Sequence, residues 1–113
     1  MHEISLAYEV ISLASHEAGK NRAQSIKEIA IEVGDLSGVE SEAFGSALGL
    51  LVKDTMLETA VINIIRIKGR GRCNSCNREF EMNHRLDSCP DCNCFPSEIS
   101  GGKEFRVVSL LVE

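Results

Sequence analysis

Four cysteines form two matched pairs in the second half of the 113-residue chain. The stretches "CNSC" and "CPDC" each place two residues between their cysteines, so that one tight turn can direct both sulfurs at a tetrahedral ion. A closed four-thiolate shell leaves no open position, which favours structural over catalytic zinc, while rubredoxin-type iron is the alternative with the same ligands. The spacing, with twelve residues between the pairs, therefore predicts a structural zinc site formed by Cys73, Cys76, Cys89 and Cys92.

Other residues near the pairs raise narrower questions. The fifth cysteine, Cys94, does not fit the spacing and is expected to be a free thiol beside the site. His84 lies between the pairs and is expected to be an exposed hairpin residue; the alternative is an auxiliary ligand or a proton-sensitive group near the metal. Asn77 and Asn93 follow the two pairs, and asparagine tolerates the left-handed backbone conformation that such turns can require.

A second candidate metal site lies at the start of the chain, in "MHE". The Met1 amine, the His2 amide nitrogen and the His2 imidazole Nδ1 can form a five-membered and a six-membered chelate ring around one ion. The Glu3 amide or carboxylate can complete the ligand set. Nitrogen-rich planar sites suit Ni(II) or Cu(II) rather than zinc. The alternative is a frayed helix start, in which Glu3 only complements the helix dipole.

Composition and charge limit the classes of function. The net charge of -5 and the pI near 5.2 argue against an electrostatic nucleic-acid binder. The sequence shows no membrane-spanning run and no signal peptide, so we expect a cytosolic protein, in which clustered cysteines bind metal instead of forming disulfides. A short basic stretch is expected to be a solvated strand end or a patch for an acidic protein partner; its residues are Arg66, Lys68, Arg70 and Arg72.

The first elements that must position these residues are a helix and a strand. Residues 3–18 carry apolar side chains at helical spacing, and Gly19 is expected to end that helix. Residues 25–34 alternate between apolar and polar side chains, which predicts a half-buried strand.

A second helix and strand are predicted next along the chain. The helix is expected to start at Ser37, which forms a capping box with Glu40. Gly45 and Gly49 lower its helix propensity, which suggests close packing against a sheet. Residues 59–68 are apolar on both faces of a strand, and they are therefore expected at the centre of the sheet.

The composition changes abruptly after this strand. Residues 68–102 are polar, cysteine-rich and bracketed by glycines, whereas residues 103–113 return to an apolar strand pattern. Because a lone strand does not fold by itself, the last strand is expected to pair with the first two. We therefore predict an α/β (α+β) fold, with two helices packed on a small three-stranded mixed sheet and an inserted zinc-ribbon-like four-cysteine subdomain. The expected domains are residues 1–67 with 103–113, and residues 68–102.

Stretches distributed along the whole chain carry a family resemblance. "MHEIS", "EVGDLSGVESEAF" and "CNSC…CPDC" with a glycine-led last strand resemble the hydrogenase maturation nickel chaperone family (HypA/HybF). The resemblance implies a nickel-binding α/β domain with an inserted structural zinc domain. By position, it makes His2 the essential nickel ligand, assisted by the Met1 amine and Glu3, and it makes the four paired cysteines the zinc ligands. The family often has glycine after each pair, where this chain has asparagine, and the fifth cysteine is additional.

The resemblance also implies a function and partners. It predicts a nickel metallochaperone, not an enzyme, which delivers Ni(II) to the large subunit of [NiFe] hydrogenase together with a GTPase partner. Urease accessory proteins are further partners within the family. The chain itself offers no nucleophile–base pair, and "GRGRCNS" lacks both the spacing and the lysine of a phosphate-binding loop. The alternative function is a zinc-ribbon adaptor or nucleic-acid-binding module with an inert N-terminus.

Overall fold

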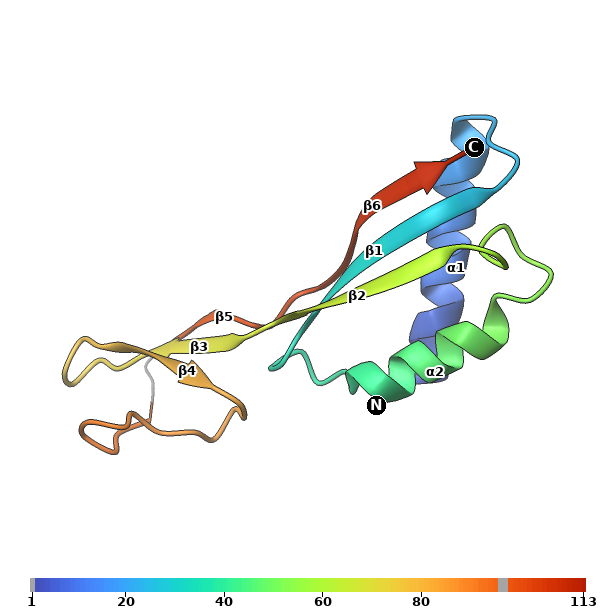
Figure 1. Cartoon of the computed structure of the whole chain (residues 1–113). Helices are drawn as coiled ribbons and strands as arrows, with labels where there is room; N and C mark the ends of the chain where they lie inside the picture. Colours follow the sequence, from blue (N-terminus) through green and yellow to red (C-terminus); the bar gives the residue numbers. More distant parts are fainter. Residues whose placement is uncertain (1, 96–97) are drawn as a thin grey trace.

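The molecule is elongated, with extents of 54 × 23 × 17 Å in the computed structural model, which describes residues 2–95 and 98–113 (Figure 1). Two helices and a three-stranded sheet form one half, and a smaller three-stranded sheet forms the other. The elements in chain order are α1 (Glu3–Lys20), β1 (Ile26–Gly34), α2 (Ser41–Leu51), β2 (Val61–Ile67), β3 (Gly69–Arg72), β4 (Glu79–Met82), β5 (Glu98–Gly101) and β6 (Phe105–Val112).

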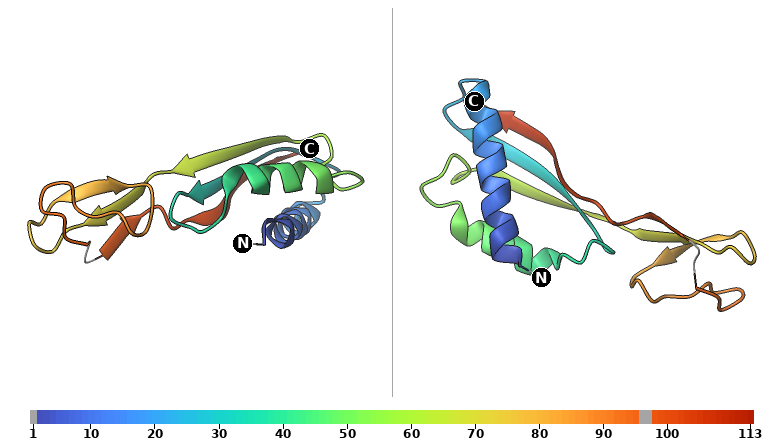
Figure 2. Two further views of the ribbon diagram at one scale, coloured as in Figure 1. Left: turned by 90° about the horizontal axis from the view of Figure 1, so that it is seen from below. Right: turned by 180° about the vertical axis from the view of Figure 1, so that it is seen from behind.

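The larger sheet has the strand order β2-β1-β6. Strand β2 runs parallel to β1 and β6 runs antiparallel to it, so the sheet is mixed. Both helices lie on the same face of this sheet (Figure 2). The predicted fold class is confirmed: two helices pack on a small mixed sheet, and a four-cysteine subdomain is inserted between β2 and β6.

The position of β2 in the sheet differs from the prediction. Its apolar residues on both faces indicated a central strand, but β1 is central and β2 lies at the edge. The last strand returns beside β1 and not beside β2. Because both helices cover the opposite face of the sheet, apolar residues on the outer face of β2 are accessible, with Val61 55% and Ile65 41% exposed.

Helix α1 continues past the glycine that was expected to end it. It runs to Lys20, and the residue with a left-handed conformation is Arg22 (φ 57°), not Gly19. The N–H groups of Arg22 and Ala23 donate to the carbonyls of Gly19 and Ala18, which closes the helix end in a Schellman arrangement. Neither helix combines the length and the hydropathy that a membrane span needs, within the described residues.

Helix α2 begins later than the capping-box prediction. It starts at Ser41, and the carboxylate of Glu40 accepts a hydrogen bond from the Ala43 N–H as the N-cap. Ser37 instead accepts a hydrogen bond from Val39 N–H in a turn that contains Gly38 at φ 84°, a conformation that a right-handed helix excludes.

The two glycines of α2 have different surroundings. A Cβ at Gly45 would lie 3.1 Å from Cδ1 of Ile64 on β2, so the predicted close packing holds there. A Cβ at Gly49 would meet no atom within 4 Å, so close packing does not explain that glycine. Most of the core lies between α2, α1 and the sheet. It includes an edge-to-face contact of Phe44 with Phe105, whose ring centroids are 5.1 Å apart.

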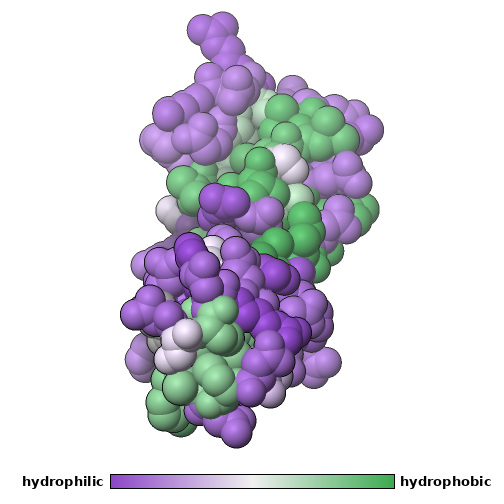
Figure 3. Space-filling view, turned by 90° about the vertical axis from the view of Figure 1, so that its left-hand side faces the viewer, coloured by the Kyte–Doolittle hydropathy of each residue, from purple (hydrophilic) through white to green (hydrophobic). Residues whose placement is uncertain are grey.

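The smaller sheet has the order β4-β3-β5 and carries the cysteine segment. The chain connects this sheet to the larger sheet at two places. One residue separates β2 from β3, and β5 leads into β6. The end of the molecule that this half forms is mostly hydrophilic around a smaller hydrophobic area (Figure 3). We call the segment from β3 to β5 the zinc ribbon, in keeping with the predicted subdomain.

Glycines allow the backbones to approach closely where the two halves meet. A Cβ at Gly34 would collide with the carbonyl group of Gly102, and Gly102 itself has φ +96°. The Gly34 N–H donates to the Glu104 carbonyl at 2.6 Å, and the Leu36 N–H donates to the Gly102 carbonyl at 2.7 Å. Because these bonds need the short backbone separation, side chains at either glycine would disrupt the junction.

Candidate metal centres

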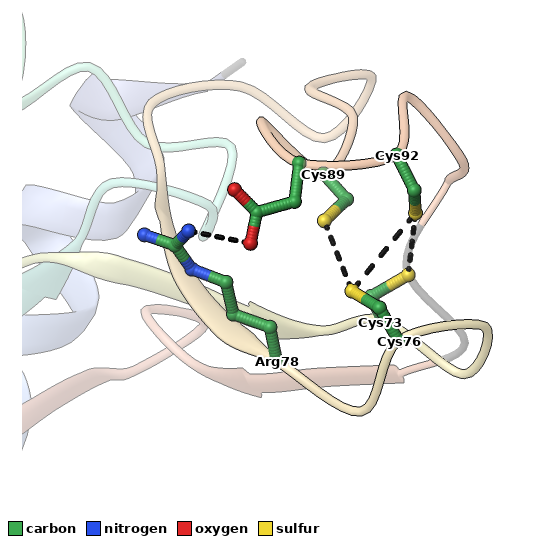
Figure 4. Close-up of polar contacts among 6 residues, drawn as sticks. Cys73, Cys76, Arg78, Cys89 and Cys92 are labelled. Atoms are coloured by element: carbon green, nitrogen blue, oxygen red, sulfur yellow. Dashed lines mark hydrogen bonds and ion pairs between the residues drawn. The ribbon is translucent and has the colours of Figure 1, made fainter.

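The four paired cysteines converge at the end of the zinc ribbon (Figure 4). Their sulfur atoms all lie within 4.8 Å of one another, with Cys73–Cys92 at 3.3 Å and Cys76–Cys89 at 3.5 Å. Zn–S bonds of about 2.3 Å in a tetrahedron place sulfurs about 3.8 Å apart. The thiols therefore surround a space that fits one ion with four sulfur ligands.

The two cysteine pairs have the same backbone structure. The N–H of Cys73 donates to the Arg78 carbonyl at 2.8 Å, and the N–H of Cys89 donates to the Cys94 carbonyl, also at 2.8 Å. Each bond spans five residues and closes a turn over the pair. Asn77 (φ 62°) and Asn93 (φ 59°) occupy equivalent positions in the left-handed region. The conformation that asparagine was expected to tolerate is therefore present in both turns.

This repeat explains why Cys94 stands apart from the cluster. Cys94 occupies the position in the second turn that Arg78 occupies in the first, where the backbone carbonyl closes the turn. Its side chain is exposed, and it does not belong to the group of four converging thiols.

Hydrogen bonds shift the pKa values of individual thiols in the cluster. The backbone N–H of Cys76, together with the Cys92 thiol, lowers the pKa of Cys73 to about 7. A backbone hydrogen bond from Cys94 favours the Cys92 thiolate, but the neighbouring Cys73 thiol and burial outweigh it and raise the pKa of Cys92. Of these two thiols, Cys73 is therefore the one whose thiolate form the surroundings favour.

An ion pair holds the two turns together beside the thiols. Arg78 Nη1 lies 2.6 Å from Asp91 Oδ2, and this contact raises the pKa of Arg78 (Figure 4). Both side chains are about half exposed, so the pair contributes little to the free energy of unfolding. Its effect is to fix the position of one turn relative to the other. The sequence interpretation did not include this pair, although an Arg after one cysteine pair and an Asp inside the other could have suggested it.

A residue from the other half of the molecule completes the core of the ribbon. Leu36, in the loop after β1, is only 2% exposed and packs with the buried Cys73, Phe80, Met82 and Cys89. Its carbonyl accepts a hydrogen bond from Arg85 Nη2 at 2.8 Å. Leu36 thus anchors the ribbon to the helical half, a role that no sequence pattern indicated.

The N-terminal residues lie far from the thiols, at the start of α1 (Figure 1). His2 is exposed, and its carbonyl accepts the N–H of Leu6 while its side chain makes no capping bond to the helix. The carboxylate of Glu3 accepts a long hydrogen bond, 3.4 Å, from the Glu40 N–H ahead of α2. Met1, the third predicted nickel ligand, lies outside the described residues.

The other histidines lie apart from both sites. His84 is exposed in the hairpin between the cysteine pairs, and its Nδ1 accepts a hydrogen bond from the Leu86 N–H at 3.2 Å. His16 is exposed near the end of α1. Within residues 2–95 and 98–113, the four paired cysteines are the group of His, Cys, Asp or Glu side chains that is placed to hold a metal ion.

Comparison with known proteins supports the same interpretation along the whole chain. The family described as "Hydrogenase/urease nickel incorporation, metallochaperone, hypA" matches residues 1–112. The chain is 37% identical over 113 residues to the hydrogenase maturation factor HypA of Geobacter metallireducens, and the match covers 100% of both chains. It is 36% identical over 113 residues to the HypA of Parabacteroides distasonis, covering 100% of this chain and 98% of that protein.

A solved structure has the same fold. The solution structure of the Ni metallochaperone HypA from Helicobacter pylori matches with a TM-score of 0.67 and 27% identity, covering 99% of this chain and 97% of that one. The family match extends from the first residue through both cysteine pairs to the last strand. The chain therefore belongs to the hydrogenase/urease nickel incorporation metallochaperone family, HypA.

Proposed function

We propose that this protein is a nickel metallochaperone that binds Ni(II) at its N-terminus and delivers it to the large subunit of [NiFe] hydrogenase, together with a GTPase partner. The observation that carries the proposal is the family match over residues 1–112, which includes "MHE" as well as both cysteine pairs. Urease accessory proteins are further candidate partners, because the family description includes urease.

The two candidate centres differ in the chemistry that each supports. The thiol cluster is closed, partly buried and tied by backbone bonds, and four thiolates suit Zn(II) in a structural role. We assign zinc to Cys73, Cys76, Cys89 and Cys92. Binding energies of about 10–16 kcal/mol for structural zinc are sufficient to fold a segment with so small a core. The corresponding structural unit is residues 68–102, inserted into the nickel-binding unit of residues 1–67 and 103–113.

The N-terminus has the opposite character, which suits a cargo site. We assign Ni(II) to the Met1 amine, the amide and imidazole nitrogens of His2, and Glu3. The imidazole of His2 is exposed and is not used to cap α1, so it is accessible to an ion. Ligands on a chain end can be removed from the metal one at a time, whereas the closed thiol shell would resist release. We propose that this division serves a non-catalytic delivery role in the cytosol.

The alternative, a nucleic-acid-binding ribbon, is disfavoured by the contacts of the basic stretch. Arg66 pairs with Asp35 at 2.9 Å, and Arg70 pairs with Glu79 at 3.4 Å. Arg72 donates two hydrogen bonds to Asn77 Oδ1. The two carboxylates offset the positive charge of Arg66 and Arg70 that a phosphate backbone would need, in a chain whose net charge is already -5.

A metal-loading experiment tests the proposal. Purified, untagged, zinc-loaded protein is titrated with Ni(II) by calorimetry while bound zinc is monitored by elemental analysis. We expect one Ni(II) per chain with zinc fully retained. Nickel that binds only by displacing zinc would contradict the assignment, and salt-sensitive binding to RNA or DNA without nickel binding would favour the ribbon alternative.

A further inference from the structure

An apolar groove lies between the N-terminal end of α1 and the outer face of α2. It has a volume of about 610 Å³ and is lined by His2, Glu3, Ile4 and Ser5 on one side, and by Ala43, Ser46, Ala47, Leu50 and Leu51 on the other. The second set recurs at helical spacing along α2, so the groove follows the helix axis.

The side chains around the groove leave unusual apolar surface in water. Leu50 is 81% exposed and Ile4 is 62% exposed, although both are large apolar residues. Small side chains at Ala43 and Ala47 form the floor between them. A floor of small residues with large apolar residues beside it is the shape that accepts the side chains of a helix.

Two carboxylates form an acidic rim at one end of the groove. Glu3 lines it, and the carboxylate of Glu40 accepts a hydrogen bond from the N–H of Ala43, which also lines it. Helix α2 contains no Lys or Arg. The only such residue of α1 is Lys20, at the far end of the helix, where it pairs with Glu17 at 3.3 Å. An occupant that carries Lys or Arg beside its apolar stripe would be complementary to this rim.

We propose that this groove is the docking site for a basic amphipathic helix of a partner protein. A second copy of this chain would bring two acidic rims together in a symmetric contact, which disfavours self-association on this face. Because His2 and Glu3 line the same groove, the docked helix would contact the residues assigned to nickel. The docking itself does not depend on nickel; its link to delivery rests on the proposed function.

The test uses a defined probe and nickel-free protein. A 14-residue peptide of leucine and lysine, ordered so that the leucines share one helix face, is titrated into ¹⁵N-labelled, untagged, zinc-loaded protein. We expect amide shift changes centred on residues 2–5 and 43–51. A peptide of the same composition in scrambled order, and one with glutamate in place of lysine, should each bind at least tenfold more weakly.

Matched variants localise the site. Leu50→Asp should weaken binding of the leucine–lysine peptide at least tenfold, whereas Leu111→Asp should leave the dissociation constant unchanged, since Leu111 is 52% exposed on a different surface. Shift changes spread over other acidic surfaces, unchanged binding by Leu50→Asp, or dimerisation of the free chain through residues 43–51 would each overturn the proposal. Nickel titration of Leu50→Asp checks the proposed function separately, and nickel binding should be retained.

Discussion

Replacing Leu36 with Ala tests whether one side chain from the helical half stabilises the zinc ribbon. Leu36 is 2% exposed and contributes to a small cluster in which four other residues are buried. Removing a buried leucine costs about 2–5 kcal/mol, including the cavity term. Because the cluster is small, with Ile99 only partly buried at its edge, we expect a value near the lower end, about 2–3 kcal/mol.

The assay is urea unfolding of the zinc-loaded protein, followed by circular dichroism and by release of zinc to a colorimetric chelator. Leu50→Ala is the matched control, because Leu50 is 81% exposed and the same chemical change should alter the free energy of unfolding by no more than about 0.5 kcal/mol. The Leu36 variant should release zinc at a lower urea concentration than the wild type. A loss below about 1 kcal/mol, or equal losses in the two variants, would refute the anchoring role.

Three further changes test other parts of the structure. Removing zinc with a strong chelator should unfold β3–β5 and leave the helical circular dichroism signal of α1 and α2 largely intact; a native ribbon without metal would contradict the structural role of zinc. Gly34→Ala should lower the melting temperature by several degrees because its Cβ would collide with the Gly102 carbonyl, whereas Gly49→Ala, in open space, should not lower it. Glu40→Ala should cost about 0.5–2 kcal/mol in urea unfolding by removing the cap of α2, and an unchanged midpoint would show that the cap is not formed in solution.

The sequence was most informative where residue type and spacing act locally. Each cysteine pair forms one tight turn, and the asparagines after the pairs take the left-handed conformation that such turns need. The alternation of residues 25–34 corresponds to β1, in which Ile29, Ile31 and Val33 are buried against the helices.

Long-range packing decided the features that the sequence did not predict. The order of strands depends on which edge of β1 the returning strand meets, and a pattern that is apolar on both faces looks the same at an edge and at the centre. The start of α2 was misplaced because Gly38 and Ser37 form a turn ahead of the helix. Nothing in the sequence around Leu36 distinguishes it from other loop residues, because the residues that bury it are distant in the chain.

The N-terminal nickel site is the central claim, and it depends on the chain's own amine. The most direct measurement is calorimetric titration of Ni(II) into three zinc-loaded proteins: the untagged chain, a chain with two extra residues ahead of Met1, and His2→Ala. We predict one Ni(II) per chain in the untagged protein, and loss of that site in both altered proteins with zinc retained. Unchanged nickel affinity in the extended protein would contradict the account.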